Sequence, residues 1–228
     1  MKHLIRKISL LATMPLLLSG CNKGLVSQDS YDNMYDHLVY CWNQSLQGSH
    51  FDNAFYGDSR VIGADFVGAF SDKSVVNLGV GGDRTSNLID RFELIKTISP
   101  KRVFLAIGGN DVLSGKYQED TFKAEYSALL DMFKENGCDV IIHTVVGLTC
   151  ANSSLKESDV NKKNDKIADV NLVIKSCAET YNYTLVDIAA VMNKEGTNEM
   201  NPEYSLDGVH FNEKGNAVWF DTIRSLVV

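Results

Sequence analysis

Residues 57–60, Gly-Asp-Ser-Arg, combine residue types and spacing that could do chemistry. They follow a short apolar stretch, residues 54–56, and precede a helix-like run that begins near residue 61. We therefore expect Ser59 at a strand-to-helix turn, where a hydrolase can place a nucleophile and the helix dipole favours developing negative charge. Gly-Asp-Ser is also ordinary turn chemistry. A catalytic interpretation needs a base, an acid that orients it, and donors for an oxyanion.

His210 is the best candidate for the base. It stands three residues after Asp207, across Gly208, in a predicted loop before the last helix. A carboxylate at that spacing could accept the proton of one imidazole nitrogen and leave the other facing Ser59. By itself this Asp-x-x-His pattern is weak. The other histidines fit less well, because they lie in the N-terminal apolar segment, on an early helix, before the first strand, and inside an apolar strand that predicts a core position: His3, His37, His50 and His143.

Three groups could hold an oxyanion. They are the backbone N–H of Ser59, the backbone N–H of Gly82, and the side-chain amide of Asn110. A glycine lets the backbone approach a substrate closely, although Gly79 or Gly81 could serve instead of Gly82. A simple turn at the glycines and a helix cap at Asn110 are the plain alternatives.

These candidates follow the ends of predicted strands. Strands are expected at 52–56, 74–79, 102–107, 139–146 and 184–188, and helices at 31–46, 61–70, 85–97, 120–136, 159–182 and 213–226. Strands that alternate with helices of this length predict an α/β domain whose parallel sheet is covered on both faces. In such folds ligands bind beyond the carboxyl ends of the strands.

Together the four blocks resemble the SGNH hydrolase superfamily, also called GDSL-type esterases and lipases. By this resemblance Ser59 falls on the nucleophile, Gly82 and Asn110 on the oxyanion residues, and His210 with Asp207 on the base and its orienting acid. The match runs from about residue 52 to the C-terminus. It implies a flavodoxin-like, three-layer α/β/α fold with a five-stranded parallel sheet. It also implies ester hydrolysis by a Ser-His-Asp triad with no metal and no cofactor.

Two arginines depart from the family pattern. Arg60 replaces the leucine of the motif, and Arg84 follows Asp83 where a threonine or a small residue is common. We favour the interpretation that both are solvated residues at helix starts. The alternative is that they place positive charge near the acyl or leaving-group pocket.

The substrate class is less well defined than the chemistry. The loop at 79–83 resembles that of platelet-activating-factor acetylhydrolase-like members, which favours short acyl esters. Alternatives within the chemistry are a carbohydrate O-acetylesterase, a lysophospholipase or thioesterase, and an envelope acyltransferase. A non-catalytic binding protein would be expected to lose Ser59 or His210, and both are present.

Composition limits the possible partners. The 228 residues carry a formal net charge of -7 and no basic run, which argues against nucleic acid as a partner. No Cys-x-x-Cys or paired-histidine spacing suggests a metal. Apart from Cys21, four cysteines remain that could form disulfides or stay as buried thiols: Cys41, Cys138, Cys150 and Cys177.

The N-terminal segment predicts export. Residues 2–7 are positively charged, residues 8–18 are mostly apolar, and 18–21 read Leu-Ser-Gly-Cys. This end resembles a bacterial lipobox, which implies a signal peptide at 1–20 and lipidation of Cys21. We expect a lipidated tether at 21–30, one hydrolase domain at 31–228, and a membrane-anchored lipoprotein of the cell envelope. A plain secreted protein with an incidental cysteine is the alternative.

The anchor can be tested by metabolic labelling. Expressed in a bacterium with radioactive palmitate, the full chain should take up label, and Cys21→Ala should lose it because acyl chains would be attached at that residue. Cys41→Ala serves as the matched control and should keep the label. Label retained in Cys21→Ala would refute the anchor.

Overall fold

A five-stranded sheet forms the centre of the structure, a computed structural model that describes residues 28–228 apart from the side chains of 28–34, 36 and 37. The strands are β1 (Asn53–Gly57), β2 (Val75–Gly79), β3 (Arg102–Ala106), β4 (Asp139–His143) and β5 (Thr184–Val186). Their order is β2-β1-β3-β4-β5, and every pair is parallel. All five carboxyl ends therefore meet at one edge, as the sequence predicts.

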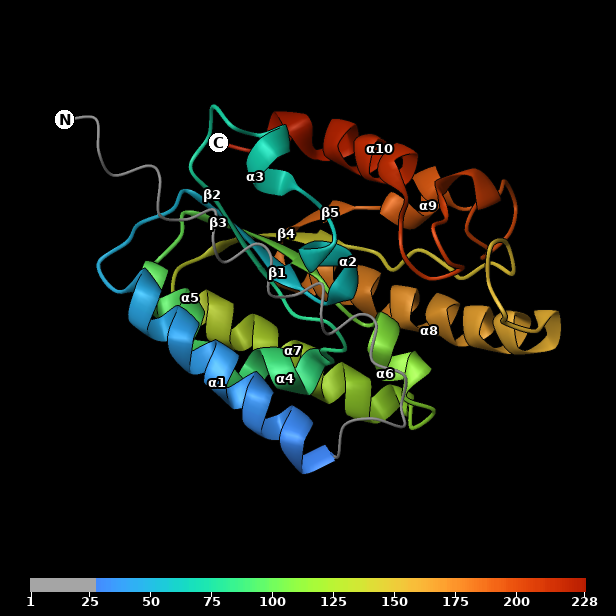
Figure 1. Cartoon of the computed structure of the whole chain (residues 1–228), viewed down its shortest axis with the longest axis horizontal. Helices are drawn as coiled ribbons and strands as arrows, with labels where there is room; N and C mark the ends of the chain where they lie inside the picture. The colour runs from blue at the N-terminus through green and yellow to red at the C-terminus, as the bar shows by residue number, and fades with distance from the viewer. Residues whose placement is uncertain (1–27) are drawn as a thin grey trace.

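Helices cover both faces of the sheet, which gives three layers (Figure 1). One face carries α1 (Gln28–Leu46), α4 (Thr85–Asp90), α5 (Glu93–Ile98), α7 (Glu119–Glu135) and α8 (Glu157–Tyr181). The other carries α2 (Ser59–Ile62), α3 (Phe66–Ala69), α9 (Ile188–Met192) and α10 (Glu213–Ile223). The short α6 (Gly109–Leu113) follows β3, and two 3-10 turns, η3 (Pro202–Tyr204) and η4 (Arg224–Leu226), flank α10.

Two hydrophobic cores lie on opposite sides of the sheet. Successive side chains of a strand point to opposite faces, so Tyr56 of β1 packs with the α1, α4, α5, α7 and α8 layer while Phe55 packs with the α2, α3, α9 and α10 layer. Phe55 stacks between Phe66 and Phe104, with ring centroids 3.7 and 4.6 Å away. Burial on both faces explains why the central strands are continuously apolar in sequence.

Two predicted helices are each broken in the structure. The helix expected at 61–70 is two short helices, because Gly63 ends α2 and the Asp65 side chain caps α3 by accepting from the Gly68 N–H. The helix expected at 85–97 is interrupted at 91 and 92, between α4 and α5. Residues 144–146, expected as the end of β4, are loop. The short helices α6 and α9 were not predicted.

The break between α4 and α5 holds a buried ion pair. Arg91 Nε donates to Asp83 at 2.8 Å, and Arg91 Nη2 donates to the Gly57 carbonyl at 3.0 Å. The guanidinium lies over the Tyr56 ring, 4.2 Å from its centroid. Only 2% of Arg91 is exposed. A buried charge is tolerated only when it is paired and hydrogen-bonded, so Arg91 ties the loop at 80–83 to the end of β1.

Removal of this cation should destabilise the domain. Arg91→Met leaves the Asp83 carboxylate buried without its partner, which typically costs about 3–5 kcal/mol. We expect a correspondingly lower urea midpoint of unfolding, followed by circular dichroism. Lys96→Met is the matched control, because its ion pair with Glu93 is exposed and surface pairs contribute little. Equal midpoints for the two variants would contradict the structural role of Arg91.

Candidate active site

Ser59, His210 and Asp207 form a continuous hydrogen-bonded chain. Ser59 Oγ lies 2.9 Å from His210 Nε2, and His210 Nδ1 lies 2.7 Å from Asp207 Oδ2. Ser59 begins α2 and His210 precedes α10, so residues 151 positions apart meet beyond the ends of the strands. The structure thus brings together the three residues that the sequence analysis selected.

Asp207 is arranged to accept rather than to donate. Its Oδ1 accepts the backbone N–H groups of Val209 and His210 at 3.0 and 2.8 Å, and its Oδ2 faces the imidazole. Burial would raise the pKa of Asp207, but the hydrogen bonds from His210 and Val209 outweigh it and the pKa is lowered. An ionised carboxylate at this point can hold the Nδ1–H tautomer of the imidazole.

Asp58 shapes the turn that presents Ser59. It is the N-cap of α2, and its Oδ1 accepts the Arg60 backbone N–H at 2.9 Å. Because the first N–H groups of a helix have no intrahelical partner, this position leaves the Ser59 N–H outside the helix's own hydrogen bonds. Asp58 is almost completely buried, and burial raises its pKa.

The proposed oxyanion residues lie on two neighbouring loops. A Cβ added at Gly81 would lie 4.0 Å from the Ser59 Cβ, so the loop after β2 runs beside the serine. Gly82 has a φ of +85°, in the region that favours glycine. Asn110, on α6, donates one amide hydrogen to the Asp83 carbonyl at 2.9 Å. An amide carries two hydrogens, so the second is available for another acceptor.

Buried carboxylates support these two loops. Asp83 is paired with Arg91, and Asp111 accepts the Thr85 N–H with both oxygens at 3.3 Å. Burial raises the pKa of each carboxyl group to about 6, although Arg91 in the first case and Thr85 in the second act in the opposite direction. The loops at 80–85 and 108–111 are therefore joined by two links, from Asn110 to Asp83 and from Thr85 to Asp111.

The histidine loop is closed on itself and anchored to the loop after β4. Ser205 and Phe211 form an antiparallel bridge, and the Leu206 N–H donates to the His210 carbonyl at 2.8 Å. Gly208, with a φ of +91°, donates its N–H to Ser205 Oγ at 2.7 Å and accepts from the Thr149 N–H at 3.0 Å. These contacts fix the bend that the sequence placed between Asp207 and His210.

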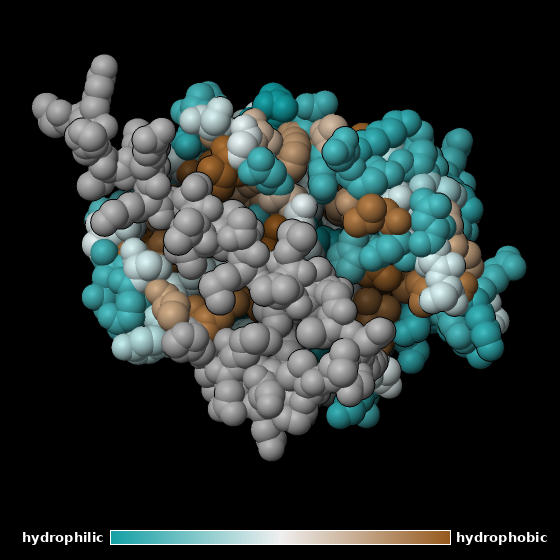
Figure 2. Space-filling view, viewed as in Figure 1, coloured by the Kyte–Doolittle hydropathy of each residue, from teal (hydrophilic) through white to brown (hydrophobic). Residues whose placement is uncertain are grey.

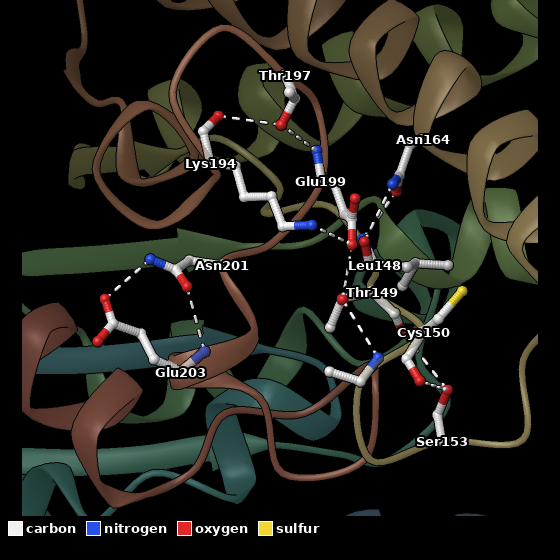
Figure 3. Close-up of polar contacts among 11 residues, drawn as sticks. Leu148, Thr149, Cys150, Ser153, Asn164, Lys194, Thr197, Glu199, Asn201 and Glu203 are labelled. Atoms are coloured by element: carbon white, nitrogen blue, oxygen red, sulfur yellow. Dashed lines mark hydrogen bonds and ion pairs between the residues drawn. The ribbon is translucent and has the colours of Figure 1, made fainter.

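Asparagine side chains hold the loop after β4 in place. Asn171 bonds the N–H and carbonyl of Val145 at 2.7 and 2.8 Å, and Asn164, two turns away on α8, bonds those of Leu148 at 2.7 and 3.0 Å. Figure 3 shows the Asn164 contact beside a second set, in which Glu199 accepts from Thr149 Oγ1 at 2.8 Å and pairs with Lys194. The side chains replace the strand hydrogen bonds that this loop lacks.

Arg60 lies at the start of α2, as expected, but its side chain is not solvated, so that part of the favoured expectation was wrong. Its guanidinium points inward and donates to three backbone carbonyls, at 2.7 to 3.2 Å. Burial lowers the pKa of its guanidinium. Arg84 matches the expectation, because it is exposed at the N-cap of α4.

Other candidates from the sequence have structural roles. His143 is buried in the sheet as expected; its Nδ1 donates to the Leu105 carbonyl at 3.2 Å, and burial lowers its pKa to about 4. No disulfide joins Cys41, Cys138, Cys150 and Cys177. Within residues 28–228, side chains do not gather into a metal-binding group, and none of the helices is long and apolar enough to cross a membrane. Cys21 and the predicted signal peptide lie outside the described residues.

Sequence reasoning missed Arg91 and the loop at 144–149. A signal for Arg91 is present: it falls on the same helical face as Leu88 and Leu94, where only buried residues are expected. For the loop there was no such signal, because its partners are asparagine side chains of α8, and sequence spacing does not show that they turn toward this backbone.

Comparisons with known proteins show the family and the fold of this chain. A model of the GDSL-like Lipase/Acylhydrolase family matches residues 42–218, more than half of the chain. The structure is similar to a GDSL-like lipase from Bacteroides thetaiotaomicron, with a TM-score of 0.67 and 24% identity over 77% of this chain and 86% of that one. It is also similar in fold to an acetylxylan esterase from Geobacillus stearothermophilus, with a TM-score of 0.59 and 20% identity over 78% and 95%.

One sequence relative is much longer than this chain. An N-acylneuraminate cytidylyltransferase of Streptococcus agalactiae serotype V is 23% identical over 160 residues, which are 70% of this chain. The chain spans only 35% of the length of that protein. From the family match over residues 42–218, we conclude that this chain belongs to the GDSL-like lipase and acylhydrolase family.

Proposed function

We propose that the protein hydrolyses carboxylic esters with short acyl groups, using Ser59 as the nucleophile. The observation that carries the proposal is the Ser59–His210–Asp207 chain, with distances of 2.9 and 2.7 Å. Such distances suit proton transfer from a hydroxyl to an imidazole that a carboxylate orients. Ester hydrolysis itself follows from the family, whereas the residue roles and the substrate are our proposal.

Acylation begins when His210 Nε2 removes the Ser59 Oγ proton as Oγ attacks the ester carbonyl carbon. The C–O bond to the alcohol then breaks, and the imidazolium returns its proton to the leaving alkoxide. Water, deprotonated by the same nitrogen, attacks the acyl-enzyme, and the acid and free Ser59 are released. Asp207 holds the Nδ1–H throughout and stabilises the imidazolium.

The oxyanion would be held by Ser59 N–H, Gly82 N–H and the second amide hydrogen of Asn110. The support is that Gly81 runs beside Ser59 and that Asn110 is bonded to the neighbouring Asp83. Donors fixed in this way need no reorganisation as charge develops, and one such donor contributes about 10²–10³ in rate.

A polar cavity beside these loops favours a second candidate substrate, an acetylated carbohydrate. It has a volume of about 80 Å³ and lies between the starts of α4 and α7. Its lining is mainly polar: Arg84, Ser86, Asp111, Ser114, Lys116, Tyr117, Gln118, Thr121, Phe122 and Glu125. Figure 2 shows hydrophilic residues over much of the surface around α9 and α10, with hydrophobic residues exposed among them. Hydroxyl-rich leaving groups suit such surroundings better than long acyl chains do.

We further propose that the enzyme works in the bacterial cell envelope, attached through a lipid on Cys21. The support is the sequence pattern of residues 1–21. Attachment would keep the domain close to its substrate, either a lipid ester or a glycan ester of the envelope.

The nucleophile assignment is tested with a chain-length panel of chromogenic esters together with acetylated sugars. Wild type should hydrolyse short acyl esters best, and chelators should have no effect. Ser59→Ala should lose about 10⁶-fold in kcat, as loss of a triad nucleophile does in other serine hydrolases.

Ser71→Ala is the control, since Ser71 is exposed before β2, at the opposite edge of the sheet. It should retain wild-type kcat. Activity in Ser59→Ala equal to that of wild type would exclude Ser59 as the nucleophile.

Gly208→Ala should displace His210. A Cβ at Gly208 would lie 2.6 Å from both the Thr149 carbonyl oxygen and the Ser153 Cβ, so the loop must shift. Misplacement of a catalytic group by about 1 Å can cost roughly 10²-fold, and we expect a loss of that size in kcat. Gly196→Ala is the matched control: its φ is +70°, yet nothing lies within 4 Å of the added Cβ. Similar kcat values in both variants would contradict the role of this bend.

A further inference from the structure

Arg60 links the nucleophile turn to the histidine loop. It follows Ser59 directly in the chain, and its Nε donates to the Val209 carbonyl at 2.9 Å. Its guanidinium also lies over the Phe211 ring, 4.9 Å from the centroid. Val209 and Phe211 are the residues on either side of His210. The side chain of Arg60 therefore contacts both neighbours of the candidate base, and its backbone is bonded directly to that of the candidate nucleophile.

The other donors of Arg60 reach a rigid support. Nη1 donates to the Val146 carbonyl at 2.7 Å and Nη2 to the Gly147 carbonyl at 3.2 Å. The Gly147 N–H in turn donates to the Asn193 side chain at 3.0 Å, and the residues on either side, Val145 and Leu148, are held by asparagines of α8. The guanidinium thus connects α2 to the loop after β4 and to the histidine loop, and its hydrogen bonds fix the spacing of these three segments.

No ion pair explains why this cation is present. Among the described residues, no carboxylate forms a salt bridge with Arg60, although Asp58 and Asp207 are close enough to interact with it electrostatically. A planar guanidinium with several donors in fixed directions can bond three carbonyls at once. A leucine has no donor, and a lysine is a single point charge that cannot span the three acceptors.

We propose that Arg60 is a positioning residue that holds His210 Nε2 in line with Ser59 Oγ. This inference rests on the proposed function, in which these two residues are base and nucleophile. The guanidinium bonds backbone carbonyls and lies over the Phe211 ring, so we infer that it acts on His210 through Val209 and Phe211. A leucine, the usual residue of the family motif at this position, could not form these hydrogen bonds.

The first test compares kcat and KM in Arg60→Met. We expect kcat for a short acyl ester to fall by about 10²-fold, the scale for a displaced catalytic group, while KM changes by less than about threefold because substrate contacts are untouched. Arg224→Met is the matched control, since exposed Arg224 lies over the Phe70 ring at 5.5 Å. It should keep wild-type kcat.

Chemical rescue separates positioning from a merely structural role. Arg60→Ala opens space next to a cavity of about 30 Å³ lined in part by Asp58, Val146 and Phe211. Millimolar guanidinium chloride should restore part of kcat in this variant, and sodium chloride at equal concentration should not. Arg60→Lys should give a kcat between those of wild type and Arg60→Met. Folded fractions are measured by circular dichroism, and kcat is expressed per folded molecule.

Two outcomes would overturn the inference. One is a wild-type kcat per folded molecule in the Arg60 variants, with only the melting temperature lowered. The other is a rise in KM of about 10²-fold with unchanged kcat, which would place Arg60 in substrate binding. If Arg60→Met does not fold, Arg60→Lys decides by the same criteria. Ser59→Ala is measured in parallel. If this variant is as active as wild type, the proposed function is wrong. If it is inactive while the Arg60 variants are fully active, only the inference about Arg60 is wrong.

Discussion

The loops that carry the candidate catalytic residues lie beyond the edge of a parallel sheet, where their backbone polar atoms need hydrogen-bond partners from outside the sheet. The rest of this structure depends on how that constraint is met. Two arginines meet it from opposite faces. Arg91 bonds the Gly57 carbonyl at the end of β1, and Arg60 bonds the Val209 carbonyl before His210. Each joins the segment that carries a catalytic candidate to a second loop. Hydrogen bonds from charged donors are stronger than neutral ones, so both loops are held firmly.

The carboxylates at this edge of the sheet differ in burial and in hydrogen bonding. Asp83 and Asp111 are buried and support the loops after β2 and β3, whereas Asp207 is more exposed and accepts three hydrogen bonds. Burial raises the pKa of the first two, and hydrogen bonds lower that of the third. The carboxylate next to the imidazole is therefore the one that stays ionised most easily, as the proposed proton transfer requires.

Regular elements were predictable because they depend on local pattern. The continuously apolar residues 103–105 and 140–142 indicated central parallel strands, and both are buried in the sheet. The helices expected at 61–70 and 85–97 were broken, because local pattern does not register that Asp65 starts a new helix or that Arg91 turns inward toward Asp83. The strand expected to reach residue 146 stopped at His143, because asparagines of α8 bond the following backbone instead.

The sequence by itself determined the residue types at the site: a serine after a strand, a glycine and an asparagine after the next two, and an aspartate three residues before a histidine. These follow from spacing along the chain, which local chemistry constrains. Only the tertiary structure decided how they meet, with Ser59 and His210 in contact across 151 residues, and which way Arg60 points. The acceptors of that guanidinium are backbone carbonyls, and since every residue has one, no sequence pattern marks those that it reaches.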